Sequence, residues 1–387
     1  MSMDYSEFEG ISPYSDEEAV EALKQVARHP YTYVISKSMF PNEKLNYLST
    51  ILSNLKSVDD FQKTVMVKAV EWDLQNTFTS FTYDGVEFLK DLPNKYLLMS
   101  NHRDIILDPA LTQYVLNENG IPMSEICVGS NLLSSKTVER LLRSNRMIKV
   151  IRGISARELY LSSQLLSKYI RTAITSGTSS VWIAQRQGRT KNGIDTTEQG
   201  LVKMLDMSGS KSFMENFKEI CIVPLAISYE YEPCDARKAC ELLISKTQTY
   251  VKKRNEDLHS IITGIRQQKG QAHLHIGHPL TEAELRIASE CAKNDRYQAI
   301  RHIVDKRIIA SYKLWKTNYM GYDLMTKSDK YADKYNPEDL EAFKKYTEHK
   351  LGKCSRSLNY EDLRQIFWEI YGNPVLAREE LVAGLFR

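Results

Sequence analysis

One histidine and two aspartates lie close together near residue 100. The segment at positions 100–108 reads SNHRDIILD. A neutral imidazole can take a proton from a hydroxyl group near neutral pH, and a nearby carboxylate can hold its tautomer and stabilise the imidazolium that forms. Asp108 could fold back to give His102 this support, and Asp104 is the rival partner. The segment predicts general-base chemistry; the plainer interpretation is an ordinary strand-end turn with Asp108 as a helix cap.

The neighbouring residues predict the elements that would position this histidine. Residues 96–99 (YLLM) form an apolar run typical of a short buried strand, and residues 109–116 (PALTQYVL) have the apolar spacing of a helix. His102 therefore falls in a strand-to-helix loop, which is where α/β folds place their chemistry.

Two basic stretches also follow predicted strands. Arg152 comes at the end of the apolar run 147–151 and just before a helix start, which favours phosphate binding. The loop after the strand at 180–184 reads QRQGRTKNG and places three cations near two glycines: Arg186, Arg189 and Lys191. Alone, this loop could equally be a solvated basic turn.

A fourth stretch, residues 222–230 (IVPLAISYE), is a long apolar strand with Pro224 near its start. Proline lacks the amide hydrogen that a central strand donates, so we expect an edge strand or the first residues of a strand. Its plainer role is in the core.

The whole chain predicts an α/β fold, a mostly parallel central sheet flanked by helices, with helical extensions at both ends. We expect a helical region over 1–81, an α/β domain over 82–280 and a helical region over 281–387. The predicted strands lie near 96–99, 125–128, 147–151, 180–184, 219–228 and 273–276, and the clearest helices lie near 16–26, 42–55, 57–76, 109–116, 136–143 and 156–175.

Composition excludes some classes of protein. The 387 residues include 52 Lys and Arg against 49 Asp and Glu, and a net charge of +3 gives no signal for nucleic acid. No apolar run approaches the length of a membrane span, and the acidic amino terminus does not resemble a signal peptide. The six cysteines are scattered, which favours free thiols in a reducing compartment. We expect a cytoplasmic protein.

Three histidines near residue 275 could be considered as metal ligands. His273 and His275 share one face of a predicted strand, and His278 falls beyond its end. Because no carboxylate cluster accompanies them, we interpret them as structural and expect neither a metal nor a cofactor.

In this order and at these intervals, the four blocks resemble the four motifs of the glycerolipid acyltransferase superfamily, which includes glycerol-3-phosphate and 1-acylglycerol-3-phosphate O-acyltransferases. The resemblance covers about residues 82–280. It implies transfer of a fatty acyl group from acyl-CoA or acyl carrier protein to glycerol 3-phosphate or a lysolipid, in phospholipid biosynthesis. It also implies peripheral association with a membrane surface.

Carried over by position, the resemblance makes His102 the general base and Asp108 its orienting carboxylate. The implied substrate-binding residues are Arg152, Arg186, Gln187, Gly188, Arg189, Lys191 and Pro224. Two departures from the family pattern stand out. Five residues separate His102 from Asp108 where the family has four, so either the loop bulges or Asp104 takes the orienting role. Gln187 stands where the family has glutamate, and it keeps similar size but loses the charge.

Two alternatives to this function follow. The acceptor could be an amino-acid lysolipid without phosphate, because arginine also binds carboxylates. The chain could also be a catalytically impaired lipid-binding homologue, if the charge missing at Gln187 is needed to organise the basic loop.

Overall fold

The chain folds around one seven-stranded sheet. The computed structural model describes residues 6–133, 135–355 and 357–385. The strands lie side by side in the order β1-β7-β6-β2-β5-β3-β4. Their bounds are β1 (Phe78–Asp84), β2 (Leu97–Ser100), β3 (Glu125–Gly129), β4 (Met147–Val150), β5 (Val181–Ala184), β6 (Ile222–Tyr229) and β7 (Gly270–Ile276).

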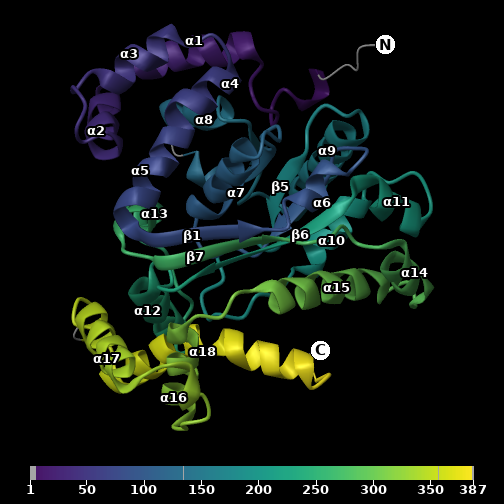
Figure 1. Cartoon of the computed structure of the whole chain (residues 1–387). Coiled ribbons are helices and arrows are strands. Elements are labelled where there is room, and N and C mark those ends of the chain that lie inside the picture. The colour runs from purple at the N-terminus through teal and green to yellow at the C-terminus, as the bar shows by residue number, and fades with distance from the viewer. Residues whose placement is uncertain (1–5, 134, 356, 386–387) are drawn as a thin grey trace.

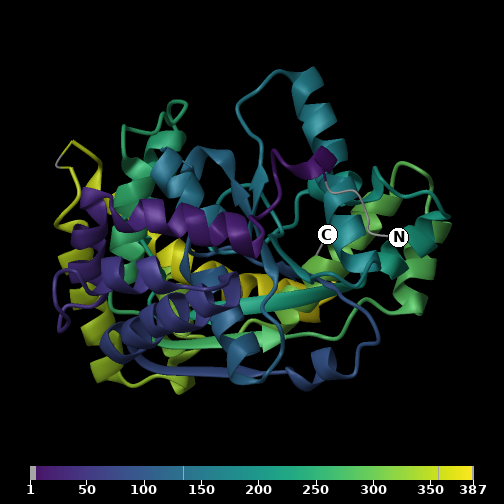
Figure 2. The same ribbon diagram turned by 90° about the horizontal axis from the view of Figure 1, so that it is seen from above.

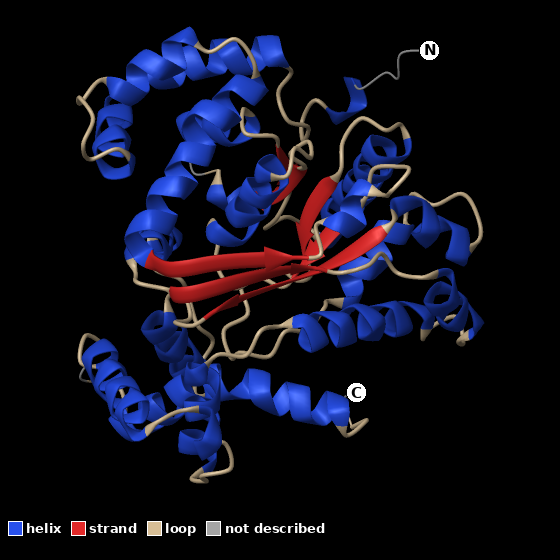
Figure 3. Cartoon of the chain, viewed as in Figure 1, coloured by secondary structure: helices blue, strands red, loops and turns tan. Residues whose placement is uncertain are grey.

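Every strand pair in this sheet is parallel except β6 with β7. A parallel sheet is covered by helices on both faces, and here the central strand β2 is buried at all four of its residues. Leu97 and Met99 point into one core and Leu98 points into the other. Figure 3 shows the sheet lying between helical layers.

The helices group by the surface that they cover (Figure 1). The amino-terminal group comprises α1 (Asp16–Ala27), α2 (Pro30–Met39), α3 (Tyr47–Asn54), α4 (Val58–Phe61) and α5 (Val67–Thr77), with a π-helical turn, Gln62–Met66, between the last two. The first four helices and the π-helical turn pack around their own small core, whereas Val70 and Leu74 of α5 pack against the core that contains Leu98 of β2. In Figure 2 these helices, purple to blue, gather on one side of the molecule. The helices α6 (Glu87–Lys90), α7 (Leu107–Glu118) and α8 (Lys136–Arg143) follow them along the chain.

One face of the sheet is covered by α7. The other face is covered by α9 (Ala156–Thr175), α10 (Gln199–Asp206), α11 (Phe213–Ile220), α14 (Glu282–Glu290) and α15 (Arg296–Ser311). A last group comprises α12 (Asp235–Ser245), α13 (Glu256–Arg266), α16 (Lys316–Thr326), α17 (Pro337–Leu351) and α18 (Tyr360–Val382). Of these, α12, α16, α17 and α18 share a separate apolar core.

The predicted fold class is confirmed, and so are the six predicted strands. The predicted start of α9 is confirmed as well, because Ser155 and Glu158 form a capping box at its amino terminus. Besides α2 and β1, the predicted elements do not include α6, α10, α11, α12 and α13. The expected boundary between residues 81 and 82 falls inside β1, which belongs to the sheet and not to the helical lead-in.

Of the two positions expected for Pro224, the edge strand is wrong, because β6 lies between β7 and β2 in the interior of the sheet. Pro224 is nevertheless the third residue of its strand, opposite the point where β7 has already ended. Its carbonyl accepts a hydrogen bond of 2.9 Å from the backbone N–H of Gly277. Because proline has no amide hydrogen, Pro224 cannot return a second hydrogen bond to Gly277, and this pair at the end of the β6–β7 ladder keeps one bond.

Among the described residues, no helix is long and apolar enough to cross a membrane.

Candidate active site

His102 lies just beyond the carboxyl end of β2, in the loop that leads into α7. Its Nδ1 atom is 3.0 Å from Oδ2 of Asp108, the second residue of that helix. The His102 side chain is 14% exposed, whereas the Asp108 side chain is fully buried. An ionised Asp108 would hold the proton of His102 on Nδ1, which leaves Nε2 as the nitrogen that can accept another proton.

The carboxylate of Asp108 is fixed by three further hydrogen bonds. Oδ2 accepts the backbone N–H groups of Arg103, at 2.6 Å, and Asp104, at 2.8 Å. Oδ1 accepts the hydroxyl of Tyr229, at 2.8 Å, from the end of β6. Burial, and then the charge of Asp108, raise the pKa of Tyr229 well above its usual value, so its hydroxyl remains a donor. These bonds prevent the carboxylate from rotating away from the imidazole.

Asp104 has a different role. Its Oδ1 accepts the backbone N–H groups of Ile106 and Leu107, both at 2.9 Å, and so caps the start of α7. Of the two predicted partners, the structure therefore places Asp108 against His102 and Asp104 against the helix terminus. The extra residue in the spacing is accommodated by the turn between β2 and α7.

A buried ionic cluster packs against the loop that carries His102. The fully buried Arg103 guanidinium contacts Asp195 at 2.7 Å and Glu232 at 3.3 Å. Lys238 contacts Glu232 at 2.6 Å and donates to the carbonyl of Arg103 at 2.7 Å. Two cations therefore face two carboxylates, which compensates the charge of groups that would be costly to bury alone. The cluster ties the His102 loop to the segment after β6, to α12 and to the loop after β5.

A cavity of about 490 Å³ opens at His102, a size typical of ligand pockets. It runs from the ends of the strands between α7, α8 and the amino-terminal helices. The part of its lining contributed by those helices is almost entirely apolar and includes Val26, Ile35, Leu48, Leu52, Phe61, Val65, Met66 and Val70.

The part of the cavity near His102 is rich in cations. Its charged lining residues are Arg152, Arg186, Arg189, Lys191 and Lys252, with Glu241 and Asp257 as the carboxylates. The two lysines pair with the two carboxylates, Lys191 with Glu241 and Lys252 with Asp257. Among the residues that the structure describes, the three arginines form no ion pair. This region therefore has uncompensated positive charge.

Two of the arginines also have unsatisfied donors. Within the described part of the chain, Nε of Arg186 and Nη1 of Arg189 are buried and have no hydrogen-bond partner. Burial alone would lower the pKa of Arg189. The electrostatic effects of Cys234, Asp104 and Glu241 are larger in sum, so the pKa is raised. Buried donors without partners are costly unless a ligand satisfies them, so they mark a place for an anion.

Arg152 reaches the cavity from the loop after β4 and lies against the end of β3. A Cβ atom added at Gly129 would come within 3.0 Å of the Arg152 guanidinium, so the glycine provides the space that this side chain occupies. Burial lowers the pKa of Arg152, and Glu198 partly offsets this effect. Its backbone N–H is held by Ser130 at 3.0 Å.

Most of the predicted residues come together, but two do not. His102, Arg152, Arg186, Gly188, Arg189 and Lys191 all line the cavity. Gln187 is exposed and lies outside the described lining of the cavity. Pro224 is buried beside Met99, well before the end of β6, and it also lies outside that lining.

The sequence analysis missed the residues that hold the site from a distance in the chain. The His102 loop is contacted by four residues that lie 92 to 135 positions further along the chain: Asp195, Tyr229, Glu232 and Lys238. No local spacing marks them, because their roles depend on how the strands are ordered in the sheet.

No protein-family model matches the chain, and no curated protein does. The crystal structure of the 1-acyl-sn-glycerophosphate (LPA) acyltransferase PlsC from Thermotoga maritima aligns with 76% of this chain and 94% of that one, at 10% sequence identity and a TM-score of 0.40. Similarity at this level is too weak to transfer a function, which must rest on the residues of this chain.

Proposed function

We propose that this protein is an O-acyltransferase that moves a fatty acyl group from an acyl thioester to a hydroxyl of glycerol 3-phosphate or 1-acylglycerol 3-phosphate. The observation that carries the proposal is a single cavity in which a histidine supported by a buried carboxylate stands between a cationic region and an apolar one. The cationic region suits a phosphate group, and the apolar region suits an acyl chain.

His102 acts as the general base in this proposal. Its Nε2 takes the proton of the acceptor hydroxyl while the hydroxyl oxygen attacks the thioester carbonyl carbon. The resulting tetrahedral oxyanion collapses with cleavage of the carbon–sulfur bond, and the imidazolium returns its proton to the leaving thiolate. Asp108 stabilises the imidazolium between these two steps, and neither an enzyme-bound acyl group nor a cofactor is needed.

Arg152, Arg186 and Arg189 bind the acceptor phosphate. A phosphate group would satisfy the buried donors of Arg186 and Arg189 and would compensate their charge. The same side chains are candidates for stabilising the oxyanion. The first turn of α7 offers few donors for this purpose, since the N–H groups of residues 103, 104, 106 and 107 are already bonded to Asp104 and Asp108.

The apolar part of the cavity takes the acyl chain. It is lined by α1, α3 and the π-helical turn, so the amino-terminal helices have a direct role in substrate binding. Burial of a long acyl chain there contributes roughly 0.8 kcal/mol per methylene. The thioester donor is acyl-CoA or acyl carrier protein.

A membrane surface is the proposed source of the acceptor. Three consecutive apolar residues at the start of α9, Leu159, Tyr160 and Leu161, are 49%, 57% and 54% exposed. They follow shortly after Arg152 in the chain, and exposed apolar residues of this kind can insert between lipid headgroups.

The test is transfer of a radiolabelled acyl group to glycerol 3-phosphate, to 1-acylglycerol 3-phosphate and to an amino-acid lysolipid without phosphate, with both thioester donors. We expect transfer to a phosphate-bearing acceptor, and a fall in kcat of about 10²–10⁴-fold in His102→Ala. His259→Ala, which removes an exposed histidine on α13, is the matched control and should leave the rate unchanged.

Gln187→Glu belongs in the same experiment. Because Gln187 is exposed and lies outside the described cavity lining, we expect this substitution to change kcat by less than an order of magnitude. Transfer by Gln187→Glu alone would contradict the proposal and make the chain as it stands a lipid-binding homologue. Transfer confined to the amino-acid lysolipid would contradict the assignment of the arginines to phosphate.

A further inference from the structure

Two histidines and an aspartate meet at the edge of the sheet, where β1 pairs with β7. In this parallel pair Thr82 lies opposite His273 and Asp84 lies opposite His275. Alternate residues of a strand share a face, so all four side chains project from the same side of the two strands. The sequence analysis rejected a metal site here because no carboxylate was near; the missed strand β1 supplies one.

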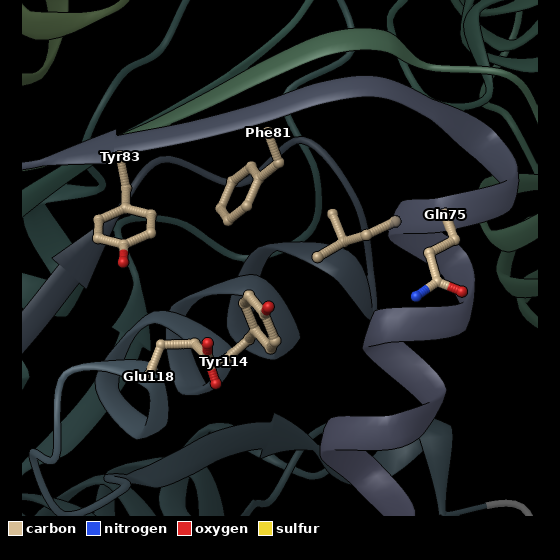
Figure 4. A pocket seen from close by; sticks show the side chains of 6 residues that line it. Gln75, Phe81, Tyr83, Tyr114 and Glu118 are labelled. Carbon is tan, nitrogen blue, oxygen red and sulfur yellow. The ribbon is translucent and has the colours of Figure 1, made fainter.

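The opposite face of β1 serves a separate purpose. Figure 4 shows Phe81 and Tyr83 pointing from β1 toward Tyr114 of α7. These residues line a second cavity, of about 310 Å³, together with Leu74, Gln75 and Glu118. Thr82 and Asp84 therefore point away from this cavity, toward the histidines of β7.

The three potential ligands are close enough to share one ion. Oδ1 of Asp84 is 2.6 Å from Nδ1 of His275 and 3.6 Å from Nε2 of His273. One nitrogen or oxygen atom from each side chain lies within 4.8 Å of the other two. Tetrahedral coordination at zinc distances places ligand atoms ~3.3 Å apart, so only a small shift is required. The Asp84 side chain is 59% exposed and is free to make it.

Thr82 prepares His273 for this role. The Thr82 hydroxyl oxygen is 2.8 Å from Nδ1 of His273 and 3.5 Å from the carbonyl oxygen of Ala272. In the tautomer with the proton on Nδ1, the hydroxyl accepts a hydrogen bond from Nδ1–H, which leaves the lone pair of His273 on Nε2, the nitrogen that is 3.6 Å from Oδ1 of Asp84. Metal-binding histidines are usually held in this way, by a hydrogen bond to the nitrogen that does not bind the metal.

The charge around the cluster is close to neutral. Asp84 is the carboxylate and Lys313 the lysine whose charges act on His273. A neutral imidazole is the form that binds a metal. Lys313 is exposed and lies over the ring of Trp315, so solvent screens its repulsion of a bound cation.

We propose that Asp84, His273 and His275 form a binding site for a divalent transition-metal ion of the zinc class. Two imidazole nitrogens and one carboxylate oxygen are a ligand set that zinc accepts, and they leave a fourth position for water or another small ligand. The site is separate from the His102 cavity and does not depend on the proposed acyl transfer. A bound ion would join β1 to β7, which are nearly 190 residues apart in the chain, and would stabilise the folded state by mass action.

The test is Zn²⁺ titration of the chelator-treated full chain, by calorimetry and by the midpoint of thermal unfolding. We expect one Zn²⁺ per chain, a rise in the midpoint, and at least tenfold weaker binding in Asp84→Asn and in His273→Gln. Both substitutions keep similar size, and the glutamine can still bond to Thr82. His349→Ala, an exposed histidine on α17, is the control and should bind Zn²⁺ as the unmodified chain does.

Co²⁺ gives a second readout, because free cysteines can also bind Zn²⁺. All six cysteines are free thiols. A Co²⁺ spectrum without thiolate charge-transfer bands, and lost in Asp84→Asn, would support the site. Thiolate bands, or Zn²⁺ affinity that is the same in Asp84→Asn and the unmodified chain, would overturn the proposal. In that case Asp84 only forms an ion pair with the two histidines.

Discussion

At the scale of single residues, the two aspartates of the His102 loop have separate tasks. Asp108 bonds to the imidazole, whereas Asp104 bonds to the backbone of α7. We expect Asp108→Asn to lower kcat for acyl transfer by about 10²–10⁴-fold, because an amide facing Nδ1 can favour the wrong tautomer of His102.

Asp104→Asn is the matched substitution for this prediction. It keeps an oxygen that can cap α7 and leaves the His102 partner in place, so we expect a loss of tenfold or less. The measurement is kcat at saturating acceptor, with circular dichroism to confirm that both variants are folded. Equal losses in the two variants would mean that the contact between Asp108 and His102 is not what supports the base.

A second residue-scale prediction concerns Glu125, a buried residue at the start of β3. Burial raises its pKa from 4.5 to about 7, although the hydroxyl of Tyr169, at 2.7 Å, partly opposes the shift. The folded state therefore holds the Glu125 proton more tightly than the unfolded state does. The associated stabilisation is fully present below pH 4.5 and is lost as the pH rises through about 7.

Glu125→Gln removes this titration and keeps an acceptor for Tyr169. At pH 8 we expect the variant to have a larger free energy of unfolding than the unmodified chain, by at most about 3 kcal/mol. Most of the difference should disappear at pH 5. Urea unfolding at the two pH values measures this difference in the free energy of unfolding. If Glu125→Gln were less stable than the unmodified chain at pH 8, burial of the Glu125 carboxylate would not be destabilising.

At the scale of elements, α13 packs closely against the His102 loop through a glycine. A Cβ atom added at Gly264 would lie 2.3 Å from Oδ2 of Asp104, the residue that caps α7. We expect Gly264→Ala to displace Asp104 and to destabilise the fold by about 1–3 kcal/mol, the usual cost of overpacking. Gly200→Ala in α10 is the control, because nothing lies within 4 Å of its added methyl group.

The control should be neutral or slightly stabilising, since alanine favours helix more than glycine does. Thermal unfolding of the two variants gives the comparison. A Gly264→Ala protein as stable as Gly200→Ala would show that α13 can move away from the loop without cost.

The elements also show which features local sequence can predict. The strand β2 is recognisable because three of its four residues, Leu97, Leu98 and Met99, form an apolar run. The start of α9 is recognisable because Ser155 and Glu158 cap it. The strand β1 is not recognisable, because it is an edge strand that is exposed at most positions and pairs with β7 far along the chain. Asp84 is therefore invisible as a partner of His273 until the sheet is assembled.

The contacts of the candidate active site also differ in whether local sequence can predict them. His102 and Asp108 are six residues apart in one loop, so their contact follows from local spacing. Tyr229, which holds the far side of the same carboxylate, is brought there by the position of β6 next to β2. Strand order in a parallel sheet is set by the packing of the whole chain, and periodicity alone does not reveal it.

At the scale of the whole molecule, the carboxyl-terminal helices support the basic loop of the site. Asp305 of α15 accepts the backbone N–H and the hydroxyl of Thr197, at 2.7 Å and 2.6 Å. Asn373 of α18 donates to the carbonyl of Asn192 at 2.7 Å. Gly193 lies against α18 so closely that an added Cβ atom would be 2.3 Å from the carbonyl oxygen of Ile370.

Two glycines of this loop allow the support from α18 to be measured. Gly188 and Gly193 have φ angles of 72° and 82°, so alanine at either position is strained by roughly 1–2 kcal/mol. Nothing lies within 4 Å of a methyl group added at Gly188, whereas a methyl group added at Gly193 would collide with the backbone of α18. We expect Gly193→Ala to lower the free energy of urea unfolding clearly more than Gly188→Ala does, and the difference reports the contact with α18. Equal losses would mean that the loop and α18 separate easily, and that the contact with α18 is dispensable for holding the loop in place.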